Sequence, residues 1–181
     1  MDMNIKKLYN QFLGKNNSDI REHLPTLIKY GKGLTVTEFG VRWGESTTAW
    51  LLSCPKKFTC YDIKILPRLK IYLPIFKEWV DKNNIDFKFI QADVLTIDID
   101  ETDILFIDTF HVYKQLKKEL ELFNNKVKKY IILHDTETYG NIGEDKSEPG
   151  LMQSVNEFVS STEWKIKKHY KNNNGLTILE K

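Results

Sequence analysis

Cysteine is scarce in this chain of 181 residues, and a long apolar run is missing. Its two cysteines, Cys54 and Cys60, are too few for a disulfide framework, which argues against a small secreted scaffold. No run approaches the roughly 20 apolar residues that a membrane helix needs. Residues 1–14 are polar and lack the apolar region of a signal peptide. These absences predict a cytoplasmic protein without a membrane partner.

A strong net charge is also missing. The 27 basic and 25 acidic residues leave a formal charge of +2, and the Lys and Arg residues form no sustained block. A nucleic-acid partner is therefore not expected, because phosphate contacts need a concentrated basic surface. The apolar fraction of 41% is ordinary for a globular protein, and the length suits one domain. We expect residues 1–181 to form a single domain.

Two helical patterns open the chain. Apolar residues recur at helical spacing over residues 5–12 and again over residues 20–28. Ser18 or Asp19 is positioned to cap the second helix, which should stop near Gly31. These patterns predict an N-terminal helical cap over residues 1–32, in front of a core over residues 33–181.

Strand and helix patterns alternate through most of the core. Five apolar, β-rich runs are expected to be strands: residues 34–39, 58–61, 85–92, 104–107 and 130–133. The intervening segments have helical spacing, which favours a parallel sheet covered on both faces. Residues 164–170 and 176–179 flank an Asn-Gly turn and predict an antiparallel hairpin. The expected fold is α/β, Rossmann-like and doubly wound, with a mostly parallel seven-stranded sheet.

Some local details of the alternation can also be predicted. Pro74 suits the first turn of a helix that contains Phe76 and Trp79, and Val127 falls at the end of a later helical pattern. Only residues 94–102 separate two of the strands, so the helix between them should be a single turn. His23 lies away from the strand ends and is expected at the surface.

An acidic residue lies at or near the end of each of the five parallel strands. In open α/β sheets, ligands bind outside the carboxyl ends of the strands. A single carboxylate there is commonly just a helix cap, but five in register indicate a ligand site: Glu38, Asp62, Asp93, Asp108 and Asp135.

The turn after the first strand is rich in glycine. Gly40 and Gly44 allow a sharp turn and a close approach of the backbone to a ligand. Ser46 or Thr47 can cap the following helix, whose N-terminus favours negative charge. The glycine spacing differs from the Gly-x-Gly-x-x-Gly of dinucleotide-binding turns, which argues against a NAD-dependent oxidoreductase.

Four segments together carry a family resemblance: residues 37–47 (TEFGVRWGEST), 105–113 (LFIDTFHVY), 133–136 (LHDT) and 173–176 (NNGL). The chain resembles the class I S-adenosylmethionine-dependent methyltransferases over residues 33–181. It is most similar to the small branch near the cephalosporin-hydroxylase and macrocin O-methyltransferase families. One departure is Thr109, which stands where this branch has glycine.

The resemblance implies a set of residues that bind S-adenosylmethionine. Glu38, Gly40 and Gly44 would hold its methionine part, with Ser46 at the N-terminus of the following helix. Asp62 would accept hydrogen bonds from the ribose hydroxyls. The adenine amino group would approach Asp93, and the backbone N–H of Val94 would donate to the ring.

The resemblance also implies an acceptor side, with Asp108, His111 and His134 as catalytic residues. Related O-methyltransferases hold a divalent cation at the fourth and fifth strand ends, which here gives Asp108, Asp135 and His134. Oxygen ligands suit Mg²⁺, whereas the histidine favours Mn²⁺, Fe²⁺ or Zn²⁺. A metal-free site with His111 or His134 as general base fits the same residues.

The expected activity is O-methylation of a small hydroxylated acceptor, for example a sugar. Its pocket should be built by the N-terminal helices and by the polar loop over residues 136–149. Two other functions stay open: a catalytically silent cofactor-binding module, and a metal-dependent hydrolase that uses Asp108, His134 and Asp135. The sequence also leaves open whether the chain forms a homo-oligomer.

Overall fold

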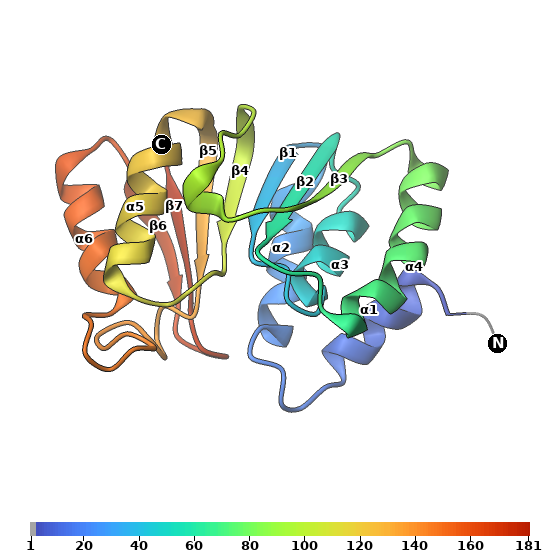
Figure 1. Cartoon of the computed structure of the whole chain (residues 1–181), viewed down its shortest axis with the longest axis horizontal. Helices are drawn as coiled ribbons and strands as arrows, with labels where there is room; N and C mark the ends of the chain where they lie inside the picture. The colour runs from blue at the N-terminus through green and yellow to red at the C-terminus, as the bar shows by residue number, and fades with distance from the viewer. Residues whose placement is uncertain (1–2) are drawn as a thin grey trace.

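A computed structural model describes residues 3–181, which form a seven-stranded sheet between two layers of helices (Figure 1). The strand order is β3-β2-β1-β4-β5-β7-β6, and β7 alone runs against the direction of the others in the described chain. The strands are β1 (Thr35–Phe39), β2 (Lys57–Asp62), β3 (Asp86–Gln91), β4 (Thr102–Ile107), β5 (Val127–His134), β6 (Lys165–Tyr170) and β7 (Leu176–Glu180). The predicted fold class, including the C-terminal antiparallel hairpin, is confirmed.

Helices cover both faces of the sheet (Figure 1). One face carries α1 (Ile5–Leu13), the short 3-10 helix η1 (Arg21–His23), α2 (Leu24–Gly31), α3 (Glu45–Leu52) and α4 (Pro67–Asn83). The other carries η2 (Val94–Thr96), α5 (Tyr113–Phe123), η3 (Asn124–Lys126) and α6 (Leu151–Ser161). The division into an N-terminal cap and a core stays a prediction.

Strand β4 shows why its sequence is apolar throughout. Ile104 and Phe106 pack into the core beneath α3 and α4, whereas Leu105 and Ile107 pack into the core beneath α5 and α6. Successive side chains of a strand point to opposite faces, so a strand covered on both sides needs apolar residues at every position. The central strands therefore anchor the edge at which the acidic residues lie.

Several local predictions are wrong. Helix α4 begins at Pro67, and Pro74 lies inside it and not in its first turn. Proline has no N–H to donate to the carbonyl of Lys70, but Lys70 is exposed, so water can satisfy this carbonyl. Val127 begins β5 and does not belong to a helix, because α5 ends at Phe123. His23 is only 1% exposed and not a surface residue.

The predicted helix caps are also wrong. Neither Ser18 nor Asp19 caps the second helix, since η1 intervenes and α2 begins at Leu24. Helix α3 starts after Gly44, which adopts the left-handed conformation and takes the cap position predicted for Ser46 or Thr47. The hydroxyl of Thr47 instead donates to buried Glu38, and that of Ser18 donates to Glu45.

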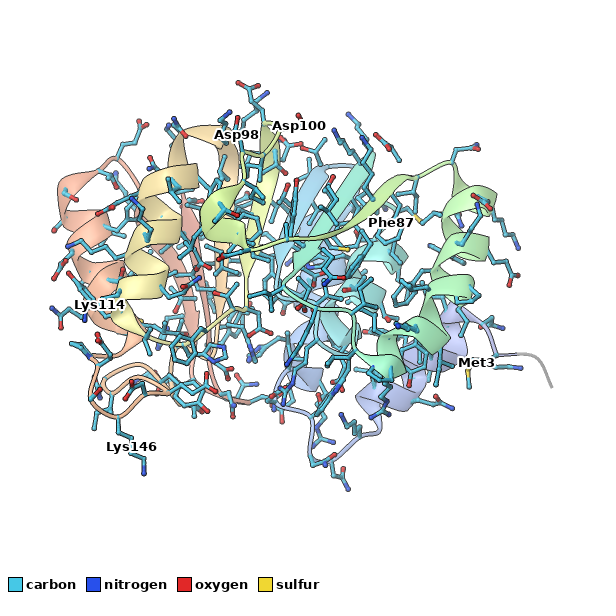
Figure 2. The ribbon with its side chains drawn as sticks, in the orientation of Figure 1. Met3, Phe87, Asp98, Asp100, Lys114 and Lys146 are labelled. Carbon is cyan, nitrogen blue, oxygen red and sulfur yellow. The ribbon has the colours of Figure 1, made fainter. Side chains whose placement is uncertain are left out.

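The crossover between β3 and β4 contains only the three-residue helix η2, as predicted. Asp98 and Asp100 of this crossover lie at one edge of the sheet, and Lys146, in the loop after β5, lies at the opposite edge (Figure 2). The carboxyl ends of the parallel strands meet at the edge that carries Lys146. Within residues 3–181, we find no helix with both the length and the apolar character to cross a membrane.

Candidate functional site

A cavity of about 360 Å³ opens at the carboxyl ends of β1 to β4. Its lining includes Gly40, Asp62, Asp93 and Asp108, which lie at or just after the ends of these strands. Strands β1 and β4 are neighbours where the strand order reverses, and this is the place where open α/β sheets bind ligands. The volume lies within the range of small-molecule sites, roughly 300–1,000 Å³.

Gly40 allows the first loop to pack against the end of β4. Its φ angle is +84°, and a Cβ atom there would lie 1.9 Å from the carbonyl oxygen of Asp108. The backbone N–H of Asp108 donates to Phe39, and that of Gly40 donates to Tyr61, both at 2.9 Å. Only glycine fits this conformation and this close approach, so Gly40 fixes the wall of the cavity.

Asp62 shapes the same loop through its carboxylate. Its Oδ2 accepts from the backbone N–H groups of Val41 and Arg42, at 2.9 and 2.8 Å, and its Oδ1 accepts from that of Lys64 at 3.0 Å. Arg42 has a positive φ of 48°, a conformation that such contacts must hold in place. A carboxylate oxygen has two lone pairs, so Oδ1 can still accept from a ligand in the cavity.

The cavity lining also combines a carboxylate with apolar side chains. Asp93 caps η2 by accepting from the N–H of Leu95 at 2.9 Å, and Val94 lies beside it in the lining. Ile63 and Phe110 also line the cavity and are 66% and 51% exposed. Exposed apolar side chains beside a carboxylate suit a flat ring that carries an amino group.

Glu38, Gly44 and Ser46 lie behind the loop and are absent from the cavity lining in the described chain. Glu38 is fully buried, and its Oε2 accepts from the hydroxyl of Thr47 at 2.6 Å. The hydroxyl of Ser46 lies near the same carboxyl group. Burial raises the pKa of Glu38 to about 8, so this side chain is a neutral acid at pH 7.

Four side chains form an acid–histidine cluster beside the cavity: Asp108, His111, His134 and Asp135. Nε2 of His111 lies 3.1 Å from Asp108 and 3.0 Å from Asp135. Nδ1 of His134 lies 3.3 Å from the same oxygen of Asp108 and 3.6 Å from Asp135. Since Asp108 also lines the cavity, the two sites share this carboxylate.

Neighbouring groups fix the orientation of both imidazole rings. Nδ1 of His111 lies 2.9 Å from a carboxylate oxygen of Glu144, and the ring stacks on Tyr139 with centroids 4.9 Å apart. Nε2 of His134 lies 3.0 Å from the backbone carbonyl of Asp19. A carbonyl can only accept, so Nε2 carries the hydrogen and Nδ1 faces the two aspartates. The sequence alone did not place these three residues beside the histidines.

The two ends of the chain meet at this edge and hold the segment that contains Asp19. The side chain of Asn173 accepts from the N–H of Glu22 and donates to the carbonyl of Ser18, both at 2.9 Å. Nε2 of His23 lies 3.0 Å from the carbonyl of Asn172. The ring of His23 packs edge-on against His134, which explains its burial. We call these contacts between residues 18–23 and 172–173 the terminal clamp.

The cluster perturbs the pKa of each of its members. Burial lowers the pKa values of His111 and His134, but the aspartates outweigh burial and raise both to about 9. Burial raises the pKa of Asp108, yet the two histidines hold it well below its usual value. Asp135 has a raised pKa, chiefly because of burial. The cluster therefore stores protons on its histidines at neutral pH.

One oxygen of the cluster is unsatisfied. Oδ1 of Asp135 is buried without a hydrogen-bond partner among residues 3–181. Donor atoms of Asp108, His111 and Asp135 lie within 4.8 Å of one another, an arrangement that could hold a metal ion. The predicted ligands were Asp108, His134 and Asp135, whereas this arrangement contains His111 in place of His134. A buried unpaired oxygen next to imidazole nitrogens fits a cation.

The chain matches no family model and no curated protein sequence. It does resemble solved structures of methyltransferases. One is the 1,6-didemethyltoxoflavin-N1-methyltransferase of Burkholderia thailandensis, solved with S-adenosylhomocysteine. It matches at a TM-score of 0.67 and 12% identity, and the match covers 96% of this chain and 87% of that chain. A second is magnesium protoporphyrin IX methyltransferase of Synechocystis with S-adenosylhomocysteine, at a TM-score of 0.64 and 11% identity over 95% of this chain and 90% of that chain. A third is the N-methyltransferase NodS of Bradyrhizobium japonicum, at a TM-score of 0.58 and 12% identity over 91% of this chain and 97% of that chain.

The chain has the class I methyltransferase fold. At these low identities the likeness concerns the fold alone, and two of the three neighbours are named as N-methyltransferases. The acceptor atom of this chain therefore has to be argued from its own site.

Proposed function

We propose that the chain is an S-adenosylmethionine-dependent methyltransferase that methylates a hydroxyl group of a small acceptor. One observation carries this proposal: the cavity and the acid–histidine cluster share Asp108. A methyl donor in the cavity and an acceptor at the cluster would meet at this residue. The class I methyltransferase fold supports the same assignment.

The cofactor would lie along the cavity. Asp62 would accept from the ribose hydroxyls through Oδ1, and the adenine amino group would approach Asp93 beside the N–H of Val94. The methionine part would lie near Gly40. Glu38, Gly44 and Ser46 would support the loop from behind, because they lie outside the lining in the described residues.

A divalent cation would be held by Asp108, His111 and Asp135, with Nδ1 of His134 beside them, and its binding would displace the proton that Nε2 of His111 carries at pH 7. The unpaired Oδ1 of Asp135 supports this assignment. Mixed carboxylate and imidazole ligands favour Mn²⁺ over Mg²⁺. Such an ion would lower the pKa of the acceptor hydroxyl.

A metal-free site with a histidine base is less well supported. A general base works best when its pKa lies near the working pH. His111 and His134 have pKa values raised to about 9 by the aspartates, so both already carry a proton at pH 7. They are poor proton acceptors in that state.

The proposed transfer is a direct displacement. The acceptor hydroxyl loses its proton to solvent, and its oxygen attacks the methyl carbon of the sulfonium. A C–O bond forms while the C–S bond breaks, and the electron pair of that bond stays on sulfur to give S-adenosylhomocysteine. Glu144 and the Asp19 carbonyl hold His111 and His134 in place during this step.

The chemical class of the acceptor follows from its surroundings. Tyr139 and Glu144 of the loop after β5, together with the segment around Asp19, surround the cluster. A polar wall of this kind suits a small hydroxylated molecule such as a sugar. The absence of a nucleic-acid partner stays a prediction from the sequence, which leaves a homo-oligomer open.

Calorimetric titration with S-adenosylhomocysteine tests the cofactor site. The wild-type chain should bind it, and Asp62→Ala should weaken binding by about 1–3 kcal/mol because two ribose hydroxyls lose a charged acceptor. Failure of the wild-type chain to bind would contradict the proposed function.

Methyl transfer from radiolabelled S-adenosylmethionine to a panel of polyols and sugars tests the reaction. Mn²⁺ should raise the rate, and Asp135→Asn should abolish this response. Asp100→Asn, at the opposite edge of the sheet (Figure 2), is the matched control and should respond like wild type. Cofactor binding without transfer to any acceptor would favour the silent binding module. Hydrolysis that needs the metal but no S-adenosylmethionine would favour the hydrolase.

A further inference from the structure

A buried glutamate lies behind the cavity, on α5. Glu119 is fully buried, and its Oε1 accepts two hydrogen bonds. One comes from the hydroxyl of Thr109 at 2.7 Å, and the other from Nε2 of Gln115 at 2.8 Å. Thr109 and Gln115 both line the cavity. Glu119 thus holds two cavity-lining side chains with one oxygen atom.

This arrangement fixes the side-chain amide of Gln115. Oε1 of Glu119 is an acceptor in both hydrogen bonds, so the group that faces it must be the NH₂ of Gln115. The carbonyl oxygen of Gln115 therefore points away from Glu119 and is available to a ligand. Oε2 of Glu119 is buried without a partner among residues 3–181, so a proton on Glu119 has its place there and leaves Oε1 free to accept.

Gln115 lies at the same end of the cavity as Asp93. Both residues line it, together with Leu95. Helix α5, which carries Gln115, packs against η2, the short helix that Asp93 caps. This end of the cavity therefore presents two acceptors, the Asp93 carboxylate and the Gln115 carbonyl.

We propose that Gln115 recognises the exocyclic amino group of adenine, and that Glu119 is the positioning residue that turns the Gln115 carbonyl toward it. The proposal rests on the proposed function, since it needs S-adenosylmethionine in the cavity. An exocyclic amino group has two hydrogens, one for Asp93 and one for Gln115. A purine with an oxygen at this position would face two acceptors and be rejected.

The same arrangement gives Thr109 a role. This residue departs from the glycine of the families that the sequence resembles, and its hydroxyl is the second donor to Glu119. Thr109 completes the hydrogen bonds of the oxygen that orients Gln115. The departure is therefore part of a Thr109–Glu119–Gln115 group in this chain.

The test compares two ligands by calorimetry: S-adenosylhomocysteine and S-inosylhomocysteine, which has oxygen in place of the amino group. Wild type should prefer the adenosyl compound by about tenfold or more. Gln115→Leu should weaken its binding about tenfold, the effect of one buried hydrogen bond. It should not weaken S-inosylhomocysteine binding, because the variant removes an acceptor that opposes the purine oxygen. The preference between the two ligands should fall by about tenfold or more.

The chain contains a matched control. Gln153 on α6 donates to Glu157 at 3.1 Å with the same spacing of four residues, but it lies outside the cavity lining in the described chain. Gln153→Leu should leave both affinities at the wild-type value. Glu119→Gln keeps an acceptor oxygen and should keep the preference, whereas Glu119→Leu should lose it as Gln115→Leu does.

The outcomes separate this inference from the proposed function. Equal weakening of both ligands by Gln115→Leu, or no weakening, would overturn the role of Gln115 while binding by wild type still supports the cofactor site. A wild-type chain that binds neither ligand would overturn both. Loss of preference in Glu119→Gln, with folding intact by circular dichroism, would overturn the orienting role of Glu119.

Discussion

Replacement of Glu38 by glutamine should change how the stability of the chain depends on pH. Glu38 is fully buried on β1, and burial raises its pKa from the ordinary 4.5 to about 8. In the folded chain its carboxyl keeps its proton up to about pH 8, whereas in the unfolded chain it ionises above pH 4.5. The folded state therefore binds more protons between these values.

The sign and size of the effect follow from proton linkage. The stability that Glu38 contributes is complete below pH 4.5 and is lost as the pH rises to 8, because ionisation favours the unfolded chain. At 1.36 kcal/mol for each pH unit, this interval corresponds to about 5 kcal/mol. Glutamine has no proton to lose, and its carbonyl can still accept from Thr47.

Urea unfolding followed by tryptophan fluorescence at pH 5 to 9 measures this difference. We expect the two proteins to differ by less than about 1 kcal/mol at pH 5. At pH 9, Glu38→Gln should be the more stable by up to about 5 kcal/mol. Glu78→Gln, which changes an exposed glutamate on α4, is the control and should parallel wild type at every pH. Parallel curves for Glu38→Gln and wild type would show that Glu38 ionises normally and would refute the reasoning.

Two further predictions concern the site itself. Gly40→Ala should abolish S-adenosylhomocysteine binding and lower the melting temperature, because the added Cβ would lie 1.9 Å from the carbonyl oxygen of Asp108. An unchanged affinity by calorimetry and an unchanged melting temperature would contradict this close approach. Glu144→Gln should weaken Mn²⁺ binding about 10- to 100-fold, measured by electron paramagnetic resonance, because His111 loses the carboxylate that orients it. Glu148→Gln breaks only the ion pair with Lys114 and should leave Mn²⁺ binding unchanged, so equal effects of the two variants would contradict the orienting role.

The strands and the acidic edge could be predicted because they depend on local patterns. Strands β1, β2, β4 and β5 are apolar runs near acidic residues, and parallel pairing brings those residues to one edge. The short crossover was visible from its length alone. The approach of Asp108 to Asp135 follows from the pairing of β4 with β5, and strand order has no local signature in the sequence.

The neighbours of the cluster could not be predicted because their contacts lack a local signature. Glu144 contacts His111 across 33 positions from within an irregular loop. Asp19 acts through its backbone carbonyl, which every residue type provides. His23 is buried by packing against His134, and its neighbours in the sequence give no sign of such a partner. Each depends on how distant segments pack.

The two halves of the proposed site differ in when they can form during synthesis. The residues that line the cavity lie between Gly40 and Gln115, whereas the terminal clamp joins Ser18 to Asn173 across 155 positions. Closing so long a loop costs chain entropy before its contacts offset the cost. A chain leaving the ribosome would assemble the cofactor half first. The carbonyl of Asp19 would orient His134 only after the last hairpin had emerged and paired.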